Sequence, residues 1–254
     1  MRTRSRWIGG RLRAPGQSAP GALCRPGSAL RCGVRILLVR HGESLGNVDP
    51  RVHATTADHA VPLSERGHQQ AREAGARIAD HLDEHVRGER PHIRLWVSPY
   101  HRTRQTADGL VETARGWITD RVEHILLCEQ QFGLFDGVAE AELPQRFPNE
   151  WSYYDMQCRF GGKFWARMPQ GESRFDVAKR IHQAFGTFHR DALEHGIRDI
   201  VVICHGVTLR AFVMMWCHLS PEWFEAEPNP HNCAIRVIDT GEDRGYLFAG
   251  FPRS

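Results

Sequence analysis

The chain has 254 residues, of which 41% are hydrophobic and 25% charged, as is typical of a globular protein with one large α/β domain or two small ones. No apolar run approaches the roughly 20 residues that cross a bilayer, so we expect no membrane partner. The net charge of +3 is uneven, because eight of the 33 basic residues and none of the 30 acidic ones lie in residues 1–35. The remainder is acidic overall, and this charge pattern predicts no nucleic-acid partner.

Residues 1–33 are rich in Arg, Gly, Pro, Ser and Ala and show no sustained periodicity, so we expect them not to pack. They are either an unstructured leader, which includes the case of an upstream start codon, or an organelle transit peptide. Strand and helix signals continue almost to the end of the chain, so residues 34–254 are expected to form one domain. The sequence leaves the oligomeric state unknown.

Seven cysteines are scattered without a C-x-x-C pair, which argues against a disulfide framework or a structural zinc site. This pattern favours a reducing compartment, and we expect a cytoplasmic protein, or an organellar one if residues 1–33 are a transit peptide. His81 and His85 are spaced by four, but the acidic residues around them indicate a solvated helix face. We therefore expect no metal site and no cofactor.

The first half of the chain alternates strand and helix signals. A buried strand over Ile36–Val39 ends in Arg40-His41-Gly42-Glu43-Ser44, and residues 47–61 are predicted to form a loop over that strand end. Ser64 is a suitable N-cap for a helix over 64–86. A second strand over 93–97, a helix over 103–114 and a third strand over 122–127 follow, the last leading through Cys128 into Glu129.

The second half begins with residues 130–170, which are irregular and rich in aromatic side chains, either a lid or specificity insert or a satellite core. A start that resembles a capping box then precedes a helix over 173–195. A strand over 200–204 leads into His205, a mostly apolar helix is expected over 207–217, and a last, edge strand over 233–238. The fold class is α/β, a three-layer sandwich with a mostly parallel sheet flanked by helices.

Four of these strands end in polar side chains. The carboxyl ends of parallel strands meet at one edge of a sheet, so two histidines, two or three arginines and a glutamate are expected to converge. Arginine forks match phosphate oxygens, and a neutral imidazole in such a pocket can attack phosphorus. The second histidine could stay protonated as a donor to the phosphoryl oxygens, and Glu129 could protonate the leaving group.

Arg40-His41-Gly42-Glu43-Ser44, with Asn47 after it, resembles the signature of the histidine phosphatase superfamily, in its phosphoglycerate-mutase-like branch. Ser98-Pro99 with Arg102, and His205-Gly206, are similar to the two later motifs of that family, and the resemblance covers about residues 34–240. It implies that His41 is the phosphorylated nucleophile and Glu129 the proton donor. Arg40, Arg102 and His205 would complete the phosphate pocket, with further substrate contacts from Gly42, Ser44, Asn47, Glu172 and, more weakly, Arg104.

The family includes mutases and phosphatases, and this chain departs from the mutases. Glycolytic mutases have Arg directly after the glutamate and Tyr two positions further on, whereas this chain has Glu129-Gln130-Gln131-Phe132. This run is similar to a plant and fungal subgroup, with bacterial relatives, that is regarded as broad-range phosphatases. We therefore expect a metal-independent phosphomonoesterase for a small phosphorylated metabolite. The alternatives are a phosphoglycerate-type mutase and a non-catalytic protein that binds phosphorylated ligands.

Overall fold

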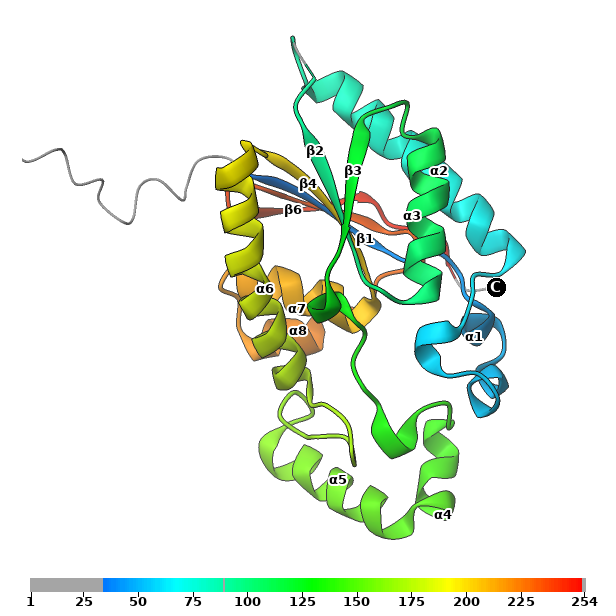
Figure 1. The fold of residues 1–254 in the computed structure, drawn as a ribbon. Helices are drawn as coiled ribbons and strands as arrows, with labels where there is room; N and C mark the ends of the chain where they lie inside the picture. The colour runs from blue at the N-terminus through cyan, green and yellow to red at the C-terminus, as the bar shows by residue number, and fades with distance from the viewer. Residues whose placement is uncertain (1–33, 89, 253–254) are drawn as a thin grey trace, which may run out of the picture. The chain divides into compact units, whose positions relative to one another are not determined.

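The computed structural model describes residues 34–88 and 90–252, so the expected leader lies outside the described residues. The described chain contains a six-stranded sheet in the order β3-β2-β4-β1-β5-β6 (Figure 1). The pairs β1·β4, β2·β4 and β2·β3 are parallel, and β5 and β6 are antiparallel additions. The strands are β1 (Arg35–Arg40), β2 (Ile93–Val97), β3 (Ile118–Glu123), β4 (Asp199–Cys204), β5 (Ile235–Asp239) and β6 (Glu242–Phe248).

Helices cover both faces of the sheet, with α2 and α3 on one face and α6, α7 and α8 on the other (Figure 1). This is the expected three-layer α/β sandwich with a mostly parallel sheet. The α-helices of the described residues are α1 (Leu45–Val48), α2 (Glu65–His85), α3 (His101–Thr113), α4 (Leu143–Arg146), α5 (Pro148–Gly161), α6 (Arg174–His195), α7 (Gly206–Trp216) and α8 (Pro221–Ala226).

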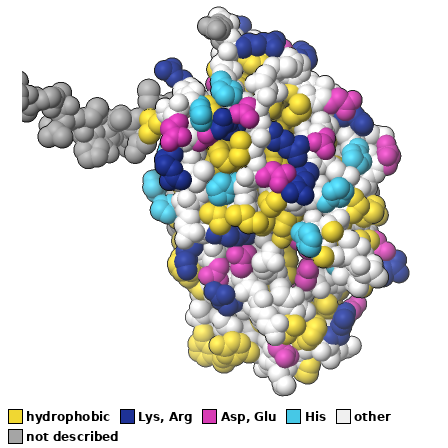
Figure 2. Space-filling model, in the orientation of Figure 1, with side chains coloured by type: hydrophobic (Ala, Val, Ile, Leu, Met, Phe, Trp, Pro, Cys, Tyr) yellow, Lys and Arg dark blue, Asp and Glu magenta, His cyan; other side chains and the backbone are white. Residues whose placement is uncertain are grey.

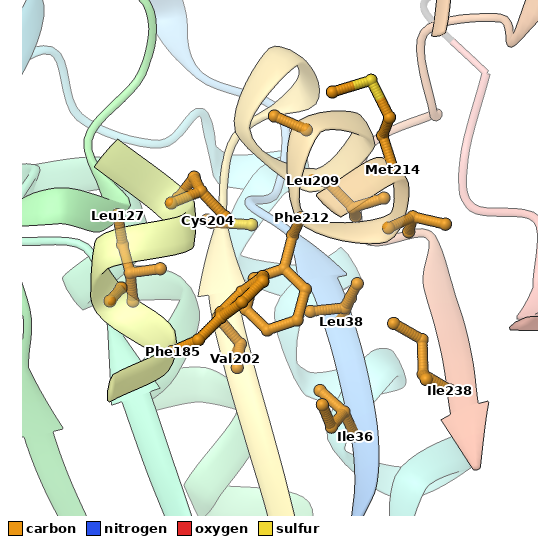
Figure 3. Close-up of a cluster of buried hydrophobic side chains, with 14 of the residues drawn as sticks. Ile36, Leu38, Leu127, Phe185, Val202, Cys204, Leu209, Phe212, Met214 and Ile238 are labelled. Carbon is orange, nitrogen blue, oxygen red and sulfur yellow. The ribbon is translucent and has the colours of Figure 1, made fainter. Parts of the chain in front are cut away.

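Alternate residues of the central strands enter two separate cores. Leu38 and Val202 pack with Phe185 of α6 and Phe212 of α7 (Figure 3). Their neighbours in sequence point to the opposite face, against α2 and α3. Strands buried on both faces explain why β1 and β4 are continuous apolar runs in the sequence.

Helix starts were predicted well because their signals are local. Ser64 Oγ accepts a hydrogen bond from the Gly67 amide at the start of α2, as an N-cap does. Ser173 and Asp176 form the predicted capping box at the start of α6. The predicted helices over 64–86, 103–114, 173–195 and 207–217 are confirmed to within two residues at each end.

A third strand is present, but its predicted bounds of 122–127 were wrong. β3 ends at Glu123, and residues 125–127 form a 3-10 turn in which His124 Nδ1 accepts a hydrogen bond from the Leu126 amide. Ile125 is 69% exposed while Leu127 is fully buried in the core, so the apolar run is a turn that packs one end into the core rather than a buried strand. The expected edge position of residues 233–238 was also wrong, because β5 lies between β1 and the unpredicted polar strand β6.

The segments expected to be irregular contain short helices. Residues 47–61 lie over the end of β1, as expected, and include 3-10 turns at Pro50–Ala54 and Asp58–Ala60. Residues 130–170 form α4, α5 and a small core of their own, in agreement with the satellite-core alternative. The members of this core are Phe135, Leu143, Tyr154 and Ala166.

Within residues 34–88 and 90–252, no helix has both the length and the apolar content that a bilayer crossing requires. On the face drawn in Figure 2, basic and acidic side chains are interspersed. Ion pairs among the described residues include Arg104 with Glu123 and Arg121 with Asp108.

Candidate active site

Three parallel strands bring the sequence motifs to one edge of the sheet. Arg40 pairs with Cys204 in the register of β1 and β4, and Val97 pairs with Ile203 in that of β2 and β4. Arg40, Val97 and Cys204 are the last residues of these strands. The residues that directly follow them are therefore neighbours at this edge: His41, Ser98 and His205.

The His41 side chain is buried, and its backbone environment orients the ring. Nδ1 lies 2.7 Å from the carbonyl oxygen of Gly42. A carbonyl oxygen can only accept, so Nδ1 carries the proton and the neutral ring has its lone pair on Nε2. Gly42 permits this arrangement because a Cβ there would lie 2.6 Å from the carbonyl oxygen of Gly67.

His205 is fully buried beside His41, with the two ring centroids 5.2 Å apart. Its Nε2 lies 2.8 Å from Ser98 Oγ. Burial, followed by the charges of Arg102 and His41, lowers the pKa of His205 well below its usual range. Without a bound anion these surroundings favour the neutral ring, and the expected protonated donor to a phosphoryl group stays a prediction.

Arg40 and Arg102 are the buried arginines at this edge of the sheet. Arg40 Nη1 donates to the carbonyl oxygen of Pro230 at 2.5 Å. Arg102 lies in the first turn of α3, where its guanidinium packs 4.9 Å from the ring centroid of Tyr100 and bonds Asp58. The Tyr100 ring in turn packs against His205, and the charge of Arg102 acts on His205.

Glu129 reaches the same place from a turn rather than from a strand end. Its Oε1 accepts from the Gln130 amide at 2.9 Å and lies 3.4 Å from Thr208 Oγ1. Thr208 belongs to the first turn of α7, and the N-cap of that helix is His205. Glu129 and His205 therefore share the N-terminal end of α7.

Glu172 supports the turn that carries Glu129. Its two carboxylate oxygens accept from Arg180 Nε and Nη2 at 2.9 and 3.1 Å, and the Gln131 amide donates to Oε2. Arg180 also donates to the carbonyl oxygens of Leu126 and Glu129. The Glu172 carboxylate thus clamps the Glu129 turn, and its expected contact with substrate stays a prediction.

Ser44 and Asn47 form a capping box at the start of α1, and the Ser44 hydroxyl accepts from the Asn47 amide. Asn47 Oδ1 accepts from Asn232 Nδ2, which also donates to the carbonyl oxygen of His41. Both residues therefore border the site through the loop they hold. Arg104 is exposed and bonds Glu123, so the structure does not bring it to the site.

Several residues of the site were missed in the sequence. They are Asp58, Tyr100, Arg180, Thr208 and Asn232. Tyr100 is the third residue after the end of β2, in the run that begins with Ser98, and this position could have indicated it. The others lie on a loop, on helices or before β5, where no local pattern distinguishes them from surface residues.

Comparison with known proteins agrees with this geometry. Residues 36–249 match the family described as the histidine phosphatase superfamily (branch 1). The chain is 36% identical to phosphoglycerate mutase-like protein AT74H of Arabidopsis thaliana, over 85% of this chain and 77% of that protein. It is 25% identical to broad-range acid phosphatase DET1 of Saccharomyces cerevisiae, over 82% of this chain and 85% of that protein.

Among solved structures, a mycobacterial glucosyl-3-phosphoglycerate phosphatase superposes with a TM-score of 0.61 at 22% identity. The superposition covers 82% of this chain and 90% of that one, and it shows a common fold. The family match over residues 36–249 also assigns the superfamily. The chain belongs to the histidine phosphatase superfamily, in its phosphoglycerate-mutase-like branch.

Proposed function

We propose that this protein is a phosphomonoesterase that acts on a small phosphorylated metabolite through a phosphohistidine at His41. The observation that carries the proposal is the bond from His41 Nδ1 to the Gly42 carbonyl oxygen, which leaves Nε2 as the nucleophile. A buried ring held in one tautomer beside cationic side chains is suited to attack on a phosphoryl group. The family relationship supports the same chemistry.

The negative charge of the transferring phosphoryl group would be stabilised by Arg40, Arg102 and His205. The guanidinium groups of the arginines and the N-terminal end of α7 both favour binding of an anion in this pocket. Phosphoryl transfer depends mainly on positioning and charge stabilisation, and these side chains supply both. We propose no metal and no cofactor, because the required positive charge comes from the protein.

Glu129 would transfer the protons. In the first step His41 Nε2 bonds to phosphorus, the bond from phosphorus to the ester oxygen breaks, and the Glu129 carboxyl protonates that oxygen. In the second step water attacks the phosphohistidine while the Glu129 carboxylate takes its proton, which releases phosphate and restores His41. The clamp of Glu172 and Arg180 holds the Glu129 turn in place for both steps.

Two observations favour hydrolysis over a mutase reaction. Gln130 and Gln131 carry no charge, and their amides bond the Glu172 carbonyl oxygen and the Tyr100 hydroxyl within the protein. A mutase must retain a phosphorylated intermediate that bears further anions, which requires more positive charge next to the site. The name of the yeast relative, a broad-range acid phosphatase, supports the same direction.

We propose a reducing compartment, with the cytoplasm as the first candidate. The described cysteines, Cys128, Cys158, Cys204, Cys217 and Cys233, are free thiols, which suits such a compartment. The organellar alternative depends on residues 1–33, which lie outside the described residues.

The test is hydrolysis of a panel of phosphate esters with a chelator present. The panel contains p-nitrophenyl phosphate, sugar phosphates and 3-phosphoglycerate. We expect release of inorganic phosphate that is unaffected by the chelator. Isomerisation of 3-phosphoglycerate without net phosphate release would instead identify a mutase, and binding without turnover of any ester would identify a ligand-binding protein.

The low pKa of His205 predicts that dianion binding takes up a proton. The lowered pKa of His205 favours its neutral ring in the protein by itself, whereas a bound dianion favours its charged form. We therefore expect sulfate, which stays dianionic throughout, to bind more tightly as the pH falls from 8 to 6. Calorimetry in buffers of different ionisation enthalpy measures the uptake, which should disappear in His205→Asn. Uptake that persists in the variant would assign the proton to His41.

A further inference from the structure

Asp58 is an acidic residue bonded directly to an arginine of the phosphate pocket. Its Oδ1 and Oδ2 accept from Arg102 Nη1 and Nη2 at 2.9 and 3.2 Å, and its carbonyl oxygen accepts from Nη1 at 2.5 Å. The Arg102 side chain is only 6% exposed and that of Asp58 18%, so water screens the pair weakly. The Asp58 carboxylate thus partly neutralises the positive charge of Arg102.

The bonds to Asp58 leave part of the guanidinium for another anion. Arginine has five N–H donors, and Asp58 takes both of those on Nη1 and one on Nη2. The Nε–H and the second Nη2–H of Arg102 are not used by Asp58. A phosphate can therefore bind the Nε side of the Arg102 guanidinium while the Asp58 carboxylate stays in place. The negative charge of Asp58 then lies at the border of the pocket.

A second acid, Asp136, responds to this charge. Asp136 is an exposed residue near Asp58, and partial desolvation together with the charge of Asp58 raises the pKa of Asp136. Arg102 and His53 act in the opposite direction on Asp136, which places all four groups in one electrostatic cluster. His53 Nδ1 lies 3.8 Å from Asp58 Oδ1. This side of the pocket therefore disfavours anions beyond the phosphoryl group that reacts.

We propose that Asp58 is a specificity-determining residue of this site, whose carboxylate on Arg102 selects monophosphate esters that carry no second anion. The inference rests on the proposed function and names its substrate class. Such an ester has an uncharged or cationic remainder. The same charge weakens the binding of the product, inorganic phosphate, and so assists its release.

The variant that tests the proposal is Asp58→Asn, which keeps the size and an oxygen acceptor for Arg102 but removes the charge. We expect inorganic phosphate to bind about tenfold more tightly, measured directly by calorimetry, because a nearby like charge is gone. The kcat/KM for a bisphosphorylated ester should rise more than that for p-nitrophenyl phosphate. Asp49→Asn is the matched control, because Asp49 is an acid of the same loop that bonds Arg51 rather than Arg102.

Weaker or unchanged phosphate binding in Asp58→Asn would overturn the proposal and show that Asp58 only positions Arg102. Should this variant fail to fold, Asp58→Ser, which also removes the charge and keeps an oxygen acceptor, takes its place in the same calorimetric comparison. Phosphate binding no tighter than in the wild type would again overturn the proposal. Lack of ester hydrolysis by the wild type would contradict the proposed function instead. Calorimetry measures phosphate binding without turnover, so it tests the role of Asp58 separately from the proposed function.

Discussion

Replacement of His41 by alanine is expected to abolish ester hydrolysis, with a decrease in kcat of at least about 10⁴-fold. The variant loses the only group proposed to bond phosphorus, while Arg40, Arg102 and His205 remain to bind the ester. Initial rates with p-nitrophenyl phosphate measure the loss. Because a phosphohistidine is labile in acid and stable in alkali, rapid quenching with radiolabelled substrate should trap it in the wild type and not in the variant.

His101→Ala is the matched control for His41→Ala. His101 is exposed in the first turn of α3, next to Arg102 in sequence, and its loss should leave kcat and the trapped label unchanged. A His41→Ala variant that still hydrolyses esters or still becomes labelled would show that the nucleophile is another residue.

Glu129→Gln is expected to have an effect that depends on the leaving group. An alkyl phosphate needs a proton on its departing oxygen, so its turnover should fall by about 10²- to 10⁴-fold. Nitrophenolate leaves without a proton, so phosphorylation of His41 by p-nitrophenyl phosphate should continue. The water step still lacks its base, and we therefore expect a burst of nitrophenolate close to the enzyme concentration, followed by slow turnover.

The control for this variant is Glu123→Gln, which removes an exposed carboxylate that bonds Arg104 at the end of β3. It should leave both substrates unaffected. If Glu129→Gln slows the two esters equally and shows no burst, Glu129 does not transfer protons, and its contribution is limited to the structure around Thr208.

Local signals explain most of what could be predicted about the fold. Caps at Ser64 and Ser173, apolar runs in β1, β2 and β4, and the order of the elements all depend on neighbouring residues. The incorrect strand predictions also arose from reliance on local signals. The run Ile125–Leu127 has the composition of a strand, yet it is a turn. The strand β6 is polar because it lies at the edge of the sheet, so its sequence carries little strand signal.

The sequence by itself determined the fold class, the family and the residues that meet at the strand ends, since strand ends and helix caps are encoded by adjacent residues. Only the tertiary structure decided what those residues bond. Asn232 meets the His41 carbonyl oxygen across 191 positions, Asp58 meets Arg102 across 44, and Glu172 accepts from the Gln131 amide across 41. Such contacts depend on how distant loops pack against one another, and no local propensity records that packing.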